Sequence, residues 1–265
     1  MAKNLISTLT TKPRETKLDA KKYRLALGKA YIQGKNGLQF TTKKTFSPST
    51  VGYGYGTCPR YWNLAFTGVD FKNNFNAQGM AAMNAGTQAH DRIQSAMGKM
   101  EYGKLVELER EVKVVDPPIR GFADAIIEID GEEIVGEIKT IKAEGFDIRK
   151  DTSTGADSHV VQLLIYMKAM NLSEGFFLYE NKNSHEVAVI PIVMSEENEK
   201  YSEYIFDWMR EVHTAWKEKK NIKRPFSESS SKCNYCPIKS ACWSSPDGRT
   251  KIEPLEVRSI WLKDA

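Results

Sequence analysis

The Asp130-Gly131 pair constrains this fold more than any other short feature, because it separates two stretches in which apolar residues alternate. Asp-Gly is typical of a two-residue hairpin turn, whose central residues both need positive φ angles. Residues 120–129 and 132–140 are therefore predicted to be antiparallel strands. Counting outward from the turn, Asp124 should lie directly opposite Glu137 across the hairpin.

The two faces of this predicted hairpin differ in chemistry. Alternation along the strands places Glu137 and Lys139 on the same face as Asp124. The opposite face is apolar and suited to a core, with Ala125, Ile127, Ile129, Ile134, Gly136 and Ile138. Facing carboxylates repel each other unless a cation neutralises them, and oxygen ligands favour Mg²⁺ or Mn²⁺. A solvated strand face explains any one of the three charged residues, but the three together favour a metal-dependent active site.

Periodicity elsewhere predicts an α/β order of elements. Further strands are expected at residues 106–115, 174–180 and 185–193, and helices at residues 79–98, 158–171 and 196–220. Ser47-Pro48 is typical of a helix start, with the serine as N-cap and the proline at the first helical position. The order is therefore helix, three strands, helix, two strands, helix, which predicts one α/β core.

The charge of the chain is unevenly distributed. Residues 1–44 hold eleven Lys or Arg residues against only Glu15 and Asp19, whereas the whole chain has a net charge of +4. We therefore divide the chain into a basic N-terminal arm at residues 1–45, a core at 46–220 and a cysteine-rich segment at 221–265. The arm is either a segment that faces a polyanion or a solvated tail, and charge alone leaves both interpretations open.

Composition indicates a globular protein of the cytoplasm, without a membrane partner. Hydrophobic residues make up 41% of the chain and charged residues 27%, and no apolar run has the length of a secretory signal or a membrane span. In the cytoplasm we expect Cys58, Cys233, Cys236 and Cys242 to stay reduced. Binding of a metal or a cluster then becomes the leading use for them.

Three further polar residues are candidates for the same site. His90 is one residue away from a stripe of alanines in the first predicted helix and is expected to face inward, although such a histidine is usually a core residue. Gln162 and Tyr166 are four residues apart in the second predicted helix and share one of its faces. Alone, either feature would be ordinary packing.

Taken in order, these residues resemble the motifs of RecB-like nucleases in the PD-(D/E)XK superfamily. The resemblance extends over residues 47–245. The matching motifs are His90, Gly121-Phe122-Ala123-Asp124, Gly136-Glu137-Ile138-Lys139 and Gln162-Leu163-Leu164-Ile165-Tyr166. The resemblance implies a mixed central sheet flanked by helices.

The resemblance also implies a role for each matching residue. His90, Asp124 and Glu137 would bind Mg²⁺ or Mn²⁺, together with the backbone carbonyl of Ile138, and Lys139 would assist the attacking water. Gln162 and Tyr166 would shape the site and contact the DNA backbone. Further candidate DNA contacts, on weaker grounds, are Arg120, Arg60 and Lys182.

The cysteines form a pattern of one early and three late residues. Cys233, Cys236 and Cys242 follow one another closely, and Cys58 precedes them by a long interval. Four thiolates can hold zinc or a 4Fe–4S cluster, and the residues alone leave both open. The pattern resembles the iron–sulfur subset of RecB-like nucleases, which includes AddB-type helicase-nucleases, the exonucleases of CRISPR adaptation and related phage exonucleases. It implies an iron–sulfur module that joins the N- and C-terminal segments.

These inferences predict a hydrolase that cleaves DNA. The resemblance implies an exonuclease acting on single-stranded DNA ends in a bacterial cell, encoded by the cell or by a phage. Its role would be in recombination, repair or CRISPR adaptation, with recombination or repair proteins as possible partners. The alternatives are a non-catalytic DNA-binding module that keeps the nuclease fold and an endonuclease of a CRISPR integration complex. The sequence retains every motif residue, which argues against a non-catalytic module.

Overall fold

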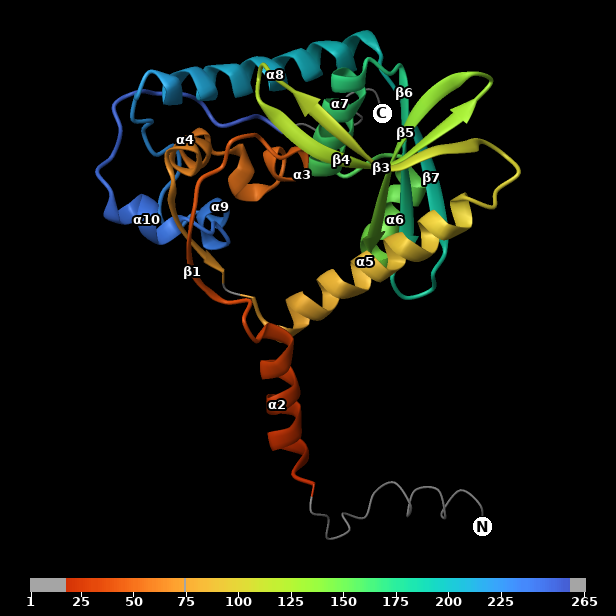
Figure 1. Cartoon of the computed structure of the whole chain (residues 1–265), viewed down its shortest axis with the longest axis horizontal. Coiled ribbons are helices and arrows are strands. Elements are labelled where there is room, and N and C mark those ends of the chain that lie inside the picture. Colours follow the sequence, from red (N-terminus) through yellow and green to blue (C-terminus); the bar gives the residue numbers. More distant parts are fainter. Residues whose placement is uncertain (1–17, 74, 258–265) are drawn as a thin grey trace.

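A five-stranded sheet with the strand order β3-β4-β5-β6-β7 organises the computed structural model, which describes residues 18–73 and 75–257 (Figure 1). The first seventeen residues of the basic arm and the last eight of the cysteine-rich segment lie outside the described residues. The strands are β3 (Lys104–Val114), β4 (Ile119–Ile129), β5 (Glu132–Ile141), β6 (Glu174–Asn181) and β7 (Val187–Val193). All five were predicted from the sequence, with small differences at their ends.

The hairpin between β4 and β5 turns at Asp130 and Gly131, as predicted. Their φ angles are +51° and +87°, the combination that matches the twist of the flanking strands. Backbone pairing runs from Ile129 opposite Glu132 to Ala125 opposite Gly136. The register expected from the turn is therefore confirmed over this length.

The sheet is mixed, as the resemblance implied. Strands β5 and β6 run parallel, with Glu137 opposite Phe177, while the other neighbouring strands are antiparallel. A parallel pair needs a crossover connection, which α6 (Ala143–Thr152) and α7 (Asp157–Met170) supply. The sequence did not predict α6, because Phe146 is its only buried residue and no apolar repeat marks it.

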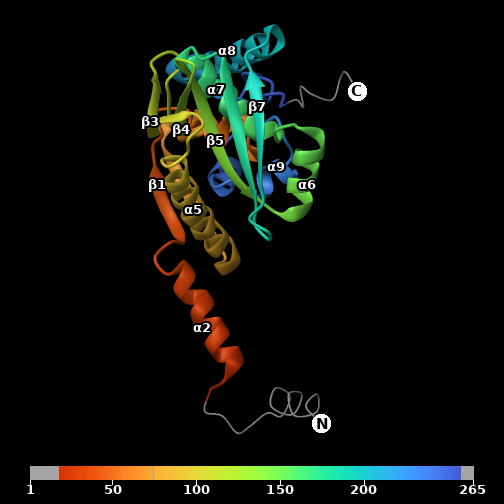
Figure 2. The ribbon, with the colours of Figure 1, turned by 90° about the vertical axis from the view of Figure 1, so that its right-hand side faces the viewer.

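Helices cover both faces of the sheet, with α5 (Ala77–Met97) on one side and α6 on the other (Figure 2). Ile93 and Met97 of α5 pack against Ala125 and Ile138, so the predicted apolar face of the hairpin is confirmed. The alanine stripe that was expected to pack against the core is only partly buried, because the N-terminal half of α5 is largely exposed. On the other face, α7 buries an apolar surface that includes Val160, Leu163, Leu164 and Met167.

A second core lies beside the sheet, under the long helix α8 (Glu196–Lys217) (Figure 1). It takes residues from the short elements α3 (Pro48–Val51), η1 (Gly54–Thr57) and α4 (Pro59–Thr67). The short helices α9 (Ser231–Asn234) and α10 (Lys239–Ser244) bury no residue, but Ile238 between them belongs to this core. Trp62 of α4 and Trp208 of α8 share this core with Ile222 and Ile252 from the C-terminal segment. Segments far apart in the sequence are thus packed into one unit.

The described part of the N-terminal arm contains regular structure that the sequence did not predict. Helix α2 (Ala20–Ile32) begins at Asp19, whose side chain accepts from the backbone of Lys22 at 2.9 Å. It buries no residue and projects from the body (Figure 1). Strand β1 (Gly37–Thr41) then pairs with β2 (Val69–Asn73) in a separate two-stranded sheet. Among the described helices, none is long and apolar enough to cross a membrane.

Candidate active site

The two central carboxylates lie where β4 and β5 separate. The pairing of β4 with β5 ends at Ala125 and Gly136. The next residue beyond this pair is Asp124 on β4 and Glu137 on β5. From Glu137 onward β5 is hydrogen-bonded to β6 on its other side. The Asp124 carboxylate fills the gap, because its Oδ2 accepts from the backbone N–H of Ile138 at 2.7 Å. The hairpin therefore brings both carboxylates together at the point where the strands diverge.

Glu137 is completely buried, and only one of its carboxylate oxygens has a partner. Gln162 Nε2 donates to Glu137 Oε1 at 2.7 Å, and Lys139 Nζ forms an ion pair with the same oxygen. Glu137 Oε2 has no hydrogen-bond partner among the described residues. Burial and then the nearby charge of Asp124 raise the pKa of Glu137 to about 8. A buried, half-satisfied carboxylate is unfavourable unless a proton or cation compensates it.

Asp124 belongs to the one group of three His, Cys, Asp or Glu residues, among those described, whose ligand atoms all lie within 4.8 Å of one another. The other two members are His90 and Glu109, and His90 Nδ1 is 3.7 Å from Asp124 Oδ1. Burial raises the pKa of Asp124, while His90 acts in the opposite direction. The structure therefore places His90 next to Asp124, and its role as a metal ligand stays a prediction.

Sequence reasoning missed Glu109, which lies across from Asp124 on the other neighbouring strand. The register of β3 with β4 shifts between Leu105 and Glu107, and Glu109 has a φ of +50°. Gln94 Nε2 links the two sides, donating to Glu109 Oε1 at 2.8 Å and to the backbone oxygen of Asp124 at 2.9 Å. Glu109 could have been predicted from the sequence, because pairing β3 with β4 around the Asp116-Pro117-Pro118 turn already brings Glu109 opposite Asp124.

These donors suit a hard divalent cation. Carboxylate oxygens and one imidazole nitrogen are ligands that Mg²⁺ and Mn²⁺ accept, whereas a soft metal would favour sulfur. Burial raises the pKa of Glu137, whose Oε2 has no partner among the described residues, and Asp124 and Glu109 lie near enough for their charges to raise it further. The residues present therefore fit such an ion. The backbone carbonyl of Ile138 as a ligand stays a prediction.

Two glycines in the motifs are required by close packing around this site. A Cβ atom at Gly136 would lie 2.4 Å from Phe176 Cζ, and one at Gly121 would lie 2.8 Å from the Tyr166 hydroxyl. Tyr166 itself donates to the backbone oxygen of Phe122 at 2.8 Å, which holds it against β4. Gln162 therefore touches a carboxylate directly, while Tyr166 supports the strand that carries Asp124.

The three residues predicted to contact DNA differ in their exposure to solvent. Arg120 is exposed, forms an ion pair with Glu111 at 2.6 Å and lies over the ring of Phe122. Lys182 is also exposed, so contact with DNA stays a prediction for both residues. For Arg60 the prediction is wrong, because its side chain is only 1% exposed and all three of its nitrogens donate to protein atoms.

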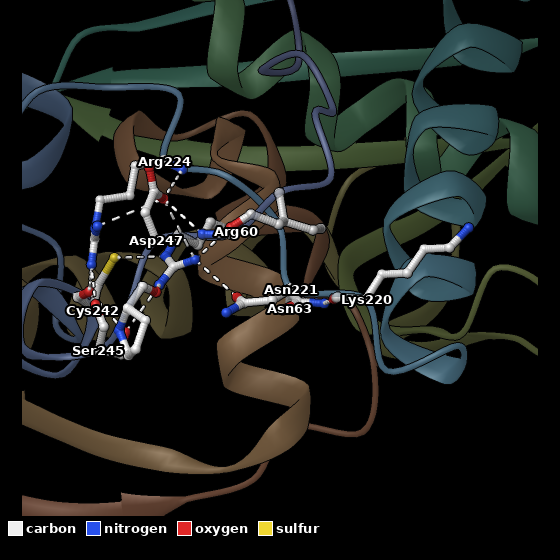
Figure 3. Close-up of polar contacts among 11 residues, drawn as sticks. Arg60, Asn63, Lys220, Asn221, Arg224, Cys242, Ser245 and Asp247 are labelled. Atoms are coloured by element: carbon white, nitrogen blue, oxygen red, sulfur yellow. Dashed lines mark hydrogen bonds and ion pairs between the residues drawn. The ribbon is translucent and has the colours of Figure 1, made fainter.

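Arg60 instead joins α4 to the C-terminal segment (Figure 3). Its Nε donates to Cys242 Sγ at 3.3 Å, and its two terminal nitrogens reach side chains or backbone oxygens of Asn221, Ile222, Ser245 and Pro246. Arg224 reinforces the same contact region by donating to the backbone oxygen of Cys242 at 2.6 Å. The guanidinium of Arg60 thus holds Cys242 in place from a residue two positions after Cys58.

The four cysteines lie in this same region of the molecule. Cys58 caps α4, Cys233 lies in α9, Cys242 lies in α10, and Cys236 lies between the two short helices. Burial, followed by the charges of the other thiols, raises the pKa values of Cys58 and Cys236 to about 12. Within the described residues, no three cysteine sulfurs lie within 4.8 Å of one another. Binding of a cluster or a metal by these cysteines stays a prediction.

Comparisons with known proteins point to one family. The family model described as "PD-(D/E)XK nuclease superfamily" matches residues 97–243. No curated protein matches the chain. Among solved structures, "Crystal structure of SSO0001" is 20% identical, with 86% of this chain and 98% of that chain covered and a TM-score of 0.40.

A second similar structure is an alkaline exonuclease, LHK-Exo, from Laribacter hongkongensis. It is 12% identical to this chain, covers 56% of this chain and 75% of that chain, and has a TM-score of 0.44. The structure of LHK-Exo in complex with dAMP is 13% identical, covers 56% and 74% of the two chains, and has the same TM-score of 0.44.

Proposed function

Because this chain belongs to the PD-(D/E)XK nuclease superfamily, we propose that it is a DNA hydrolase whose active site is built on Asp124, Glu137 and Lys139. The observation that carries this proposal is the paired burial of two carboxylates beside one lysine, with Glu137 Oε2 unpartnered. His90, Glu109 and Asp124 would hold Mg²⁺ or Mn²⁺, and Glu137 would be a further ligand. When bound, the cation lowers the pKa of a coordinated water and neutralises charge developing on the phosphodiester.

The chain's own residues divide the remaining work. Lys139 is held next to Glu137, where its ammonium can orient the attacking water and stabilise negative charge on the phosphorus centre. Gln162 fixes the Glu137 carboxylate through its hydrogen bond to Oε1. Tyr166 holds β4 at Phe122, so that Asp124 stays opposite Glu137. The site therefore combines positioning with charge neutralisation, the two requirements of phosphodiester hydrolysis.

We further propose that the substrate is single-stranded DNA cleaved from an end. This part of the proposal comes from the resemblance to RecB-like exonucleases. The basic residues at 1–44 would strengthen DNA binding through phosphate contacts, and Arg120 would add one beside the site. The setting would be recombination, repair or CRISPR adaptation in bacterial cytoplasm. An endonuclease of an integration complex is distinguished by cleavage of circular single-stranded DNA, which an exonuclease leaves intact.

The four cysteines would hold a 4Fe–4S cluster that fastens α4 to the C-terminal segment. Two observations support this proposal, the split of one early and three late cysteines and the proximity of the thiols, whose charges add to burial in raising the pKa values of Cys58 and Cys236. Visible absorbance of the anaerobically purified protein tests the proposal, and a colourless protein with stoichiometric zinc contradicts it.

Removing catalytic groups one at a time tests the nuclease proposal. Lys139→Ala and Asp124→Ala should abolish the release of nucleotides from a labelled oligonucleotide in Mg²⁺ or Mn²⁺, while both variants still fold cooperatively and keep the visible absorbance of the wild type. Glu109→Gln should weaken Mn²⁺ binding, measured by calorimetry, because it removes one of three grouped ligands. Full activity of Lys139→Ala or Asp124→Ala would refute the proposed mechanism. Wild-type protein that binds DNA without cleaving it would favour the non-catalytic alternative.

A further inference from the structure

A hollow of about 280 Å³ lies between α5, the end of β5 and the turn that joins β6 to β7. Thr140 in its wall directly follows Lys139, and Ala89 in its wall directly precedes His90. The hollow therefore begins one residue away from the candidate active site on two separate elements. Its other polar lining residues are Gln88, Arg92, Glu180, Lys182 and His185.

A buried carboxylate organises the cationic side chains of this hollow. Glu180 is 1% exposed, and Arg92 Nη2 donates to both of its oxygens at 2.7 Å. His185 Nδ1 lies 2.6 Å from Glu180 Oε1. Arg92 and His185 nevertheless remain 55% and 67% exposed. Glu180 therefore holds one nitrogen of each side chain, while much of the rest of both side chains faces solvent. Nε and Nη1 of Arg92 have no partner among the described residues and can donate to a ligand.

The turn that carries Lys182 and His185 is held in one conformation. Asn181 N–H donates to Glu186 O at 2.9 Å, and His185 N–H donates to Asn181 O at 2.8 Å. Lys182 N–H donates to Ile141 O at 2.9 Å, which ties the turn to the end of β5. The two side chains are therefore presented from a fixed backbone, as a specific binding site requires.

The charge of the lining favours an anion. Glu180 is the only carboxylate among the lining residues, against Arg92, Lys182 and, when protonated, His185. Thr140 and Gln88 add neutral donors. Guanidinium and ammonium groups combined with hydroxyl and amide donors are the usual contacts of a phosphate in a nucleic-acid backbone.

We propose that this hollow binds a backbone phosphate of the DNA strand whose phosphodiester bond is cleaved at the Asp124–Glu137 site. Arg92 and Lys182 supply the charge, and Glu180 positions Arg92. The inference rests on the proposed nuclease function and deepens it, because it assigns a substrate subsite to residues outside the active-site motifs. A phosphate held there keeps the strand in place next to the metal ligands.

Binding measured in a Lys139→Ala background separates this subsite from catalysis. Fluorescence anisotropy of a labelled single-stranded oligonucleotide, with Mg²⁺ present, gives the Kd over a range of salt concentrations. Adding Lys182→Ala should raise the Kd about 5-fold and reduce the salt slope by about 0.7, the value for one lost contact to a single strand. Lys182 is exposed, so this change keeps the fold. Arg92→Gln should have a similar or larger effect.

Exposed cations on α8 provide matched controls. Lys217→Ala matches Lys182→Ala, and Arg210→Gln matches Arg92→Gln, because Arg210 forms an ion pair with Asp207 as Arg92 does with Glu180. Both controls should leave the Kd within twofold of the parent. The subsite is refuted if Lys182→Ala and Arg92→Gln change the Kd as little as these controls do. The nuclease proposal is tested separately, by nucleotide release from the wild type, and would not be affected by that result.

Two further outcomes would also overturn the subsite. The hollow would hold released product if the variants weakened binding of a deoxynucleoside monophosphate but not of the oligonucleotide. A parent that binds no DNA, combined with a wild type that cleaves none, refutes the subsite and the nuclease proposal together.

Discussion

Replacing Glu137 with glutamine should inactivate the enzyme and at the same time make the metal-free protein more stable at alkaline pH. The side chain is completely buried, its Oε2 has no described partner, and Asp124 lies next to it. Glutamine has the same shape and keeps a carbonyl oxygen for the hydrogen bond from Gln162. The change therefore removes a poorly compensated charge while preserving the packing.

The size of this effect follows from the shift in the pKa of Glu137 from 4.5 to about 8. Because the folded state holds this proton more tightly than the unfolded state, stability falls as pH rises between these two values and levels off above pH 8. Each pKa unit corresponds to about 1.4 kcal/mol, so the upper limit is about 5 kcal/mol. Loss of the Lys139 ion pair offsets part of this, and we expect a net gain of about 2 kcal/mol at pH 9.

Urea unfolding, followed by tryptophan fluorescence in the presence of EDTA, measures the effect. The wild type should lose stability between pH 5 and pH 9, and Glu137→Gln should lose markedly less. Adding Mg²⁺ or Mn²⁺ should reverse the order, because an ion bound only by the folded state stabilises the wild type by mass action. Nucleotide release should be absent in the variant under all conditions.

Glu180→Gln is the matched control, since Glu180 is also a buried carboxylate. Both oxygens of Glu180 accept from Arg92, and one also contacts His185, so neutralising this group breaks charge-assisted bonds. We expect Glu180→Gln to lose about 2 kcal/mol at pH 9. Destabilisation of Glu137→Gln to the same extent as Glu180→Gln, under metal-free conditions at that pH, would contradict this expectation.

Three other substitutions probe features of the fold. Gly136→Ala should reduce the free energy of unfolding by about 2 kcal/mol, because its new methyl group would overlap the ring of Phe176; an unchanged urea midpoint would contradict this. His159 has a pKa lowered to about 3, chiefly by burial, so the wild type should lose up to about 1.4 kcal/mol per pH unit as pH falls from 6.5 towards 3. His159→Phe should flatten that slope in urea titrations at pH 4 and 6, and an equal slope in both proteins would count against it. Arg60→Lys should cost about 3 kcal/mol, because one ammonium cannot replace a buried guanidinium that donates in several directions, whereas exposed Arg120→Lys should shift the Tm little.

The central hairpin was predictable because its determinants are local. Asp130 and Gly131 set the turn, the turn sets the register, and the register brings Asp124 beside Glu137. Lys139 and Gln162 then follow from strand alternation and helical spacing. Each of these relations acts over a short stretch of chain, so it can be predicted from the local pattern of residues.

Other parts of the site depend on contacts that no local pattern records. Glu109 becomes a candidate ligand only once β3 is paired with β4, because nothing in its own stretch of chain marks it. Arg60 looks like a surface cation in the sequence, and its burial depends on residues from 221 to 246. Helix α6 exposes most of its residues, so apolar periodicity could not mark it. In each case the deciding neighbour is distant in the sequence.

The bonds from Arg60 to residues near the other end of the described chain also order the events of folding. While a ribosome is still synthesising residues 221–246, the guanidinium of Arg60 has none of its acceptors, and the core under α8 lacks Ile222 and Ile252. The sheet with its carboxylates and helix α8, which packs against α4, are already synthesised by then, but α4 still lacks its hydrogen bonds to the C-terminal segment. We expect a chain that ends before residue 221 to be less stable, because Arg60 is buried in the folded protein and would lack its acceptors there.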